Sequence, residues 1–176
     1  MSFFIDSSKY SYSNIFDRNL SSLKWSYKAR VFLNLLRTHT SNIGWLDKNH
    51  EFRKGETADD IVERLWAFCE VSIAQTRGFH ICNLPGCEEH NKSRKPILAT
   101  RQGITFLLGS AEIRVFGKGR KVYAAPNLIY HYVTAHEYQM PDAFVAALMT
   151  GPLPGSSEYT KRVEELGMRL TKTYQV

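Results

Sequence analysis

The sequence lacks the segments that direct a chain into or across a membrane. No apolar run approaches the ~20 residues of a membrane-spanning helix. The N-terminus shows no basic segment followed by an apolar stretch, the pattern of a secretory signal. Cysteines are few and odd in number, at three, so a disulfide framework is not expected. Together these absences predict a cytoplasmic protein with reduced thiols and no membrane partner.

The composition is that of an ordinary globular domain. Hydrophobic residues make up 43% and charged residues 23% of the 176 residues, which excludes a disordered chain or a fibrous repeat. The length corresponds to one domain. We therefore expect a single domain over residues 1–176, with about the first 40 residues and the tail after residue 154 as peripheral elements.

Hydrophobic periodicity predicts helices on both sides of a central β region. Helical spacing of apolar residues covers residues 24–37, 57–75, 126–137, 141–149 and 157–170. Short β-rich stretches predict strands at 79–82, 104–108, 113–116 and 122–125, the last two joined by a hairpin turn at 117–120. This order predicts an α+β fold in which a central antiparallel hairpin or small sheet is flanked by several helices.

Two cysteines flank a turn in the middle of the chain. Residues 82–87 read Cys-Asn-Leu-Pro-Gly-Cys, and a tight turn at Pro85 and Gly86 brings the sulfur atoms of Cys82 and Cys87 toward a common point. Zn²⁺ binds four ligands at the corners of a tetrahedron, and thiolates are among its preferred ligands. Neighbouring reduced cysteines therefore predict half of a zinc site.

Three histidines are candidates for the other half. His131 and His136 lie near the end of a predicted helix at a spacing that zinc fingers also use. Positions five apart on a straight α-helix differ by about 140°, so either the helix changes geometry near His136 or only one of the two binds. His80 lies two residues before Cys82 in a predicted strand and so points to the same side. The predicted ligands are Cys82, Cys87 and His131, with His136 or His80 as the fourth.

A cysteine turn, a hairpin and a ligand-bearing helix form the arrangement of a treble-clef-like zinc site. The catalytic pattern His-Glu-x-x-His is broken, because Met140 stands where the second histidine is needed after His136. The deaminase pattern is also absent, and two thiolates reduce the Lewis acidity of zinc. We predict a structural zinc and no catalytic residue. The alternatives are a reduced thiol pair beside core histidines, and a nucleophilic Cys82 activated by His80 or His131.

The charge is mildly basic, since Lys and Arg exceed Asp and Glu by 23 to 17. Basic residues gather at 90–95 and around the predicted turn, at 114–121. Short charge runs of this kind are usually solvated loops and hairpin tips. The net charge and the nearby tyrosines keep nucleic-acid binding as an alternative; these tyrosines are Tyr123, Tyr130 and Tyr132.

Residues 43–149 contain five notable sequence blocks: Ile43-Gly44-Trp45-Leu46-Asp47 with His50-x-Phe52 and Gly55; Gly78-Phe79-His80-x-Cys82; Gly109-x-Ala111-Glu112-Ile113-Arg114-Val115; Tyr123-Ala124-Ala125-Pro126-x-Leu128-Ile129-x-His131-Tyr132-Val133-x-x-His136-x-Tyr138; and Pro141-x-x-Phe144. Together these blocks resemble an uncharacterised family of small bacterial proteins. The family form of the cysteine pair is Cys-x2-Cys, whereas this chain has Cys-x4-Cys. The resemblance implies that the cysteine turn belongs with the histidine helix, and it implies no activity.

The sequence therefore predicts an interaction module, held together by a structural zinc, that binds a protein partner. A nucleic-acid-binding protein is the first alternative. A zinc-dependent hydrolase with an open coordination position is the second.

Overall fold

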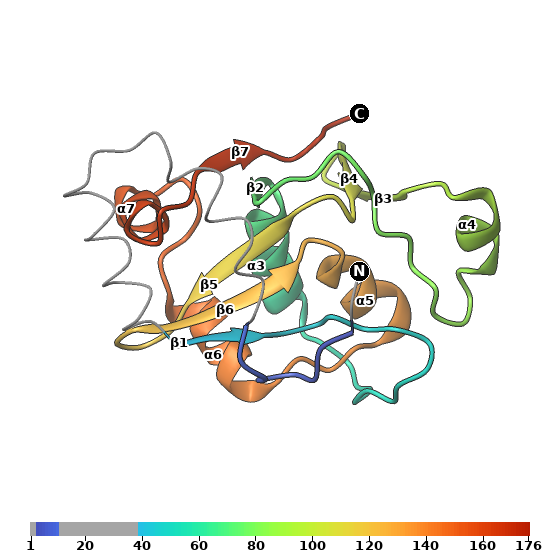
Figure 1. Ribbon diagram of the computed structural model, residues 1–176, viewed down its shortest axis with the longest axis horizontal. Coiled ribbons are helices and arrows are strands. Elements are labelled where there is room, and N and C mark those ends of the chain that lie inside the picture. The colour runs from blue at the N-terminus through green and yellow to red at the C-terminus, as the bar shows by residue number, and fades with distance from the viewer. Residues whose placement is uncertain (1–2, 11–38) are drawn as a thin grey trace.

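The computed structural model describes residues 3–10 and 39–176 (Figure 1). In chain order its elements are β1 (His39–Asn42), α3 (Asp59–Cys69), β2 (Val71–Ile73), α4 (Glu88–Ser93), β3 (Ile97–Arg101), β4 (Ile104–Leu108), β5 (Glu112–Phe116), β6 (Lys121–Pro126), α5 (Ile129–His136), α6 (Asp142–Thr150), α7 (Ser157–Glu165) and β7 (Leu170–Lys172). Helices and strands are mixed, which confirms the predicted α+β class. The helix predicted at 24–37 lies outside the described residues.

A five-stranded sheet, in the order β1-β6-β5-β2-β7, forms the centre of the fold. The β5–β6 hairpin is antiparallel and is closed by the predicted turn, while β1 joins β6 in parallel. A separate antiparallel pair, β3–β4, projects beside the sheet. The second edge of β4 is bonded to the C-terminal residues, because Leu107 N donates to the Tyr174 carbonyl.

The core lies between the sheet and the helices. Every residue of the central strand β5 is buried, and α3 and α6 pack against this strand. The amphipathic pattern of α3 accounts for its position, since the buried side of the helix carries Val62, Leu65, Trp66, Phe68 and Cys69. Helix α4 differs from the others in having no buried residue, and it lies at the opposite end of the molecule from α7 (Figure 1).

Three predicted elements need correction. The helix predicted over 57–75 ends at Cys69, because the next residues form strand β2, which pairs with β5 and β7. Residues 79–82 are not a strand; His80 N in this segment donates to the carbonyl of Gly109, which lies between β4 and β5. The helix predicted over 157–170 ends at Glu165, and the chain then forms β7.

Arg114 also departs from the expectation for the basic group at 114–121. Its side chain is 1% exposed and makes an ion pair of 2.7 Å with Glu112, which is likewise buried. A guanidinium can remain charged in the core only when such partners compensate the loss of water. Arg114 is therefore part of the core and not of a solvated hairpin tip.

No helix in the described part of the chain has both the length and the apolar character needed to cross a bilayer.

Candidate metal centre

The cysteine turn has the predicted geometry. Cys87 N donates to the Leu84 carbonyl at 3.1 Å, and Gly86 has a φ of +91°. A proline followed by a residue with positive φ is the signature of a type II turn, in which glycine is favoured at the second central position. The turn lies between Cys82 and Cys87, and Cys87 then begins helix α4 by accepting a bond from Asn91 N.

The histidines come from the last two turns of α5. His136 is the last residue of this helix, and Glu137 follows it in the left-handed conformation with φ of +56°. The helix is closed by a bond from Tyr138 N to the Tyr132 carbonyl. Both residues lie within α5, and the 140° separation of their positions on the helix does not keep the two rings apart. Their Nε2 atoms are 3.2 Å from each other.

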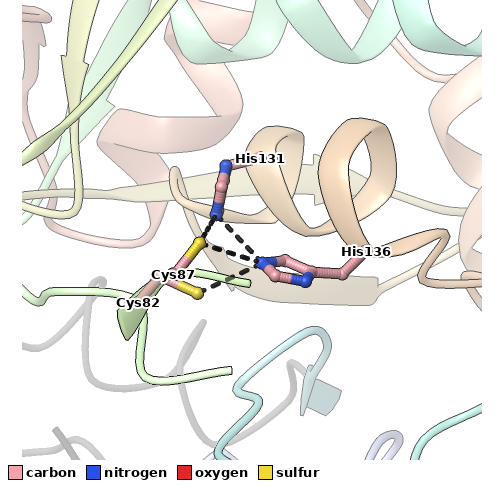
Figure 2. Close-up of side chains that lie close together, drawn as sticks. All are labelled: Cys82, Cys87, His131 and His136. Atoms are coloured by element: carbon pink, nitrogen blue, oxygen red, sulfur yellow. Dashed lines mark hydrogen bonds between the residues drawn. The ribbon is translucent and has the colours of Figure 1, made fainter. Parts of the chain in front are cut away.

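Four ligand atoms converge between the turn and the helix (Figure 2). The Cys82 sulfur is 3.3 Å from His136 Nε2, and the Cys87 sulfur is 3.4 Å from both His131 Nε2 and His136 Nε2. All four atoms lie within 4.8 Å of one another. The residues Cys82, Cys87, His131 and His136 could therefore hold one metal ion.

The spacing matches the edges of a zinc tetrahedron. Bond lengths of about 2.05 Å to nitrogen and about 2.3 Å to sulfur give edges of about 3.3 Å between two nitrogens and about 3.6 Å between nitrogen and sulfur. The nitrogen pair is at 3.2 Å, and three of the four nitrogen–sulfur pairs are at 3.3–3.4 Å. These four distances are within a few tenths of an ångström of the ideal edges, and the two remaining edges, Cys82–His131 and Cys82–Cys87, are no longer than 4.8 Å.

The protonation states also suit a dication. Burial and the neighbouring charges of His136 and His90 lower the pKa of His131 to about 4, and burial and Lys54 lower the pKa of His136, which favours the neutral form of both imidazoles. Burial, together with Cys87, raises the pKa of Cys82 to about 12. A bound dication favours the thiolates, and two thiolates neutralise it, so the complete centre carries no net charge. The raised pKa also argues against Cys82 as a free nucleophile, which needs a lowered one.

His80 does not belong to the group of four. It is half-buried, and burial lowers its pKa to about 4. Its side chain lines a different cavity, shared with Phe79, Ile81 and Asn83. The expectation that His80 and Cys82 share a face required a strand at 79–82, which the structure does not have.

The tyrosines offered in support of nucleic-acid binding are part of the core. Tyr123 and Tyr130 are each 6% exposed, and Tyr132 is 1% exposed. Rings buried to this extent cannot stack on bases, so these three residues no longer support the nucleic-acid alternative.

Sequence reasoning missed the loop that lies against the helix end. Gly55 N donates to the Glu137 carbonyl and Gln139 N donates to the Arg53 carbonyl, so residues 47–54 run beside the centre. A cleft of about 300 Å³ separates this loop from His136. The only sequence feature that pointed to this loop was the family-like block at residues 43–55. Residues 47–54 supply no ligand atom to the group of four.

Gly109 fixes the segment that leads to Cys82. It has a φ of +99°, and a Cβ there would overlap the carbonyl oxygen of His80. We expect Gly109→Ala to lower the free energy of unfolding by about 2–4 kcal/mol, from left-handed strain plus overpacking, and to weaken metal binding by displacing Cys82. Urea unfolding and metal competition measure the two effects.

Gly103 provides the matched control. It also has a positive φ, of +79°, but a Cβ there would meet open space. Gly103→Ala should therefore lose only about 1–2 kcal/mol and keep its metal affinity. Equal losses in the two variants would show that the contact with His80 is unimportant.

The chain belongs to a domain family of unknown function, DUF7919, whose sequence model matches residues 2–149. The match includes all four residues of the metal centre. Neither the curated proteins nor the solved structures contain a match to this chain.

Proposed function

We propose that the protein is a zinc-stabilised interaction module. One Zn²⁺ is coordinated by the sulfurs of Cys82 and Cys87 and by Nε2 of His131 and His136. The observation that supports this proposal is the spacing of these four atoms, which fits a tetrahedron of two sulfurs and two nitrogens. That ligand set and geometry favour zinc over magnesium, calcium or copper(II).

The role of this zinc is structural. Four protein ligands leave no coordination position for water or substrate, which is the arrangement of structural and not of catalytic zinc. The hydrolase alternative requires an open position and gains no support from the group of four. Thiolate ligands require reduced cysteines, in keeping with a cytoplasmic protein.

The metal fixes the exposed helix α4, which offers a surface to a partner protein. Helix α4 has no buried residue, so packing against the core does not hold it in place. Its first residue follows Cys87 directly, and a metal bound there fixes α4 relative to α5. An exposed helix held by a metal at one end is suited to binding a partner.

Replacing one ligand tests the metal site. Protein purified without chelator is expected to contain one zinc per chain, and Cys82→Ser is expected to lose it, because a serine hydroxyl is a poor zinc ligand. Metal analysis measures both. Cobalt substitution should give the absorption spectrum of a tetrahedral thiolate complex in the parent protein and not in the variant.

Cys69 supplies the control for the same chemical change. It is fully buried and its sulfur donates to the Asn127 carbonyl, a bond that a serine hydroxyl can also make. Cys69→Ser should therefore keep one zinc per chain. A folded Cys82→Ser protein with full zinc content would contradict the proposed ligand set.

A further inference from the structure

A second cavity lies on the other side of the cysteine loop. Its volume is about 630 Å³, within the range of about 300–1,000 Å³ that small-molecule sites occupy. Its lining residues are Phe79, His80, Ile81, Asn83, Asn91 and Arg94. One wall leads into Cys82 and the other belongs to α4 and its C-terminal cap, which follow Cys87. The metal ligands therefore tie both walls of this cavity together.

Arg94, an exposed residue, gives the cavity a positive charge. Arg94 lines it, no carboxylate does, and no residue in the described ranges forms an ion pair with Arg94. The cleft beside His136 differs in this respect, because acidic and basic residues both line it. A guanidinium without a partner favours an anion with two or more oxygen atoms, since its parallel N–H groups bind phosphate or carboxylate in a bidentate manner.

The remaining lining residues favour a planar group with polar edges. Phe79 and Ile81 are half-buried and give the cavity an apolar surface. Asn83 and Asn91 add two amides, each of which can donate and accept hydrogen bonds.

We propose that this cavity binds a nucleotide. The phosphate binds at Arg94, the base lies against Phe79, and the amides of Asn83 and Asn91 contact the edge of the base. Aromatic stacking and amide contacts to base edges are the usual means by which proteins bind unpaired bases. The proposal rests on the proposed zinc site to the extent that the metal holds the two walls together.

The test is a titration of the zinc-loaded protein with AMP, adenosine and inorganic phosphate, followed by calorimetry and by amide chemical shifts. AMP is expected to bind more tightly than either adenosine or phosphate alone, with shifts confined to residues 79–96. Equal affinity for AMP and phosphate would show a simple anion site and would overturn the proposal. So would the absence of AMP binding to protein with full zinc content, a result that leaves the zinc site intact.

Arg94→Gly is the decisive variant. Arg94 caps α4 in the left-handed conformation with φ of +52°, where glycine fits without strain, so the variant is expected to fold and keep its zinc. Loss of a charge-assisted contact should weaken AMP binding by about 10- to 100-fold and leave adenosine binding unchanged. Lys92→Gln, a charge change on the same helix outside the cavity, should have less than about a threefold effect. Equal effects of the two variants would contradict the placement of the phosphate.

Two further experiments determine whether the ligand is a free nucleotide or part of a strand, and whether binding depends on the metal. A single-stranded oligonucleotide bound more tightly than AMP, with the same Arg94 dependence, identifies a nucleotide within a strand as the ligand. Weaker binding of the strand identifies the free nucleotide. Chelated protein should lose AMP binding, and chelated protein that binds AMP unchanged would overturn the dependence of the cavity on the metal.

Discussion

Removal of the metal is expected to release residues 79–96 from the fold and to leave the five-stranded sheet intact. Between residues 78 and 96 only Cys82, Leu84 and Cys87 are buried, so two of the three buried positions are proposed metal ligands. Helix α4 has no buried side chain that could hold it once the metal is gone. The sheet has its own core, formed by β5, β6 and the helices packed on them.

The size of this effect follows from linkage. A metal that binds only the folded chain stabilises it by about 4 kcal/mol when its free concentration is about 1,000 times the Kd. For a chain of 176 residues this corresponds to a decrease in Tm of about 8–16 °C on chelation. Hydrogen exchange with and without chelator locates the effect: amides of 79–96 should exchange rapidly, whereas those of β5 and β6 should stay protected.

Two outcomes would contradict the expectation. A Tm that does not change on chelation would mean that the thiols and imidazoles contribute as an uncharged cluster. Loss of protection throughout the sheet would mean that the metal is required for the whole fold and not for one segment. Readdition of zinc should restore both protection and Tm, because the ligands do not form a disulfide in the folded chain.

The local half of the metal centre was predictable because short-range chemistry determines it. The Pro-Gly sequence between the cysteines specifies a tight turn, and the structure has this turn at Pro85 and Gly86. The choice between His136 and His80 was not predictable, because it depends on how residues 79–82 pack against distant parts of the chain. These residues form no strand, and His80 lines another cavity.

Strand β2 shows why part of the fold could not be predicted. Cys69 and Ile73 are four residues apart, which fits a continuing helix. Yet Ile73 pairs with Glu112 and with Leu170, partners far along the chain. Short apolar stretches fit both the helical and the strand periodicity, and only long-range strand pairing decides between a helix and a strand. The same reasoning explains Arg114, whose burial depends on Glu112 and on Tyr10 from the N-terminal segment.

The second large effect is expected at the buried ion pair of β5. Burial lowers the pKa of Arg114, but the Glu112 carboxylate and the Tyr10 hydroxyl raise it by more, so the guanidinium stays charged in the core. Glu112→Gln removes the compensating charge and keeps the shape. We expect the free energy of unfolding to fall by about 3–5 kcal/mol, the cost of leaving a buried charge without its partner. Urea unfolding of the zinc-loaded protein measures it.

Asp47 allows the same carboxylate-to-amide change at an exposed pair. Asp47 and His50 are also 2.7 Å apart, but their side chains are 23% and 48% exposed, against 6% and 1% for Glu112 and Arg114. Asp47→Asn should therefore cost no more than about 1 kcal/mol. A loss in Glu112→Gln as small as that in Asp47→Asn would show that water reaches Arg114.

The double variant Glu112→Leu/Arg114→Met separates the cost of an unpaired charge from the net contribution of the pair. Desolvation of two ions offsets most of their attraction, so apolar residues of similar volume often replace a buried pair without loss. We expect the double variant to recover most of the stability lost in Glu112→Gln. If it is instead less stable than Glu112→Gln, the pair itself stabilises the sheet, and its bonds to the hydroxyl of Tyr10 contribute to that stability.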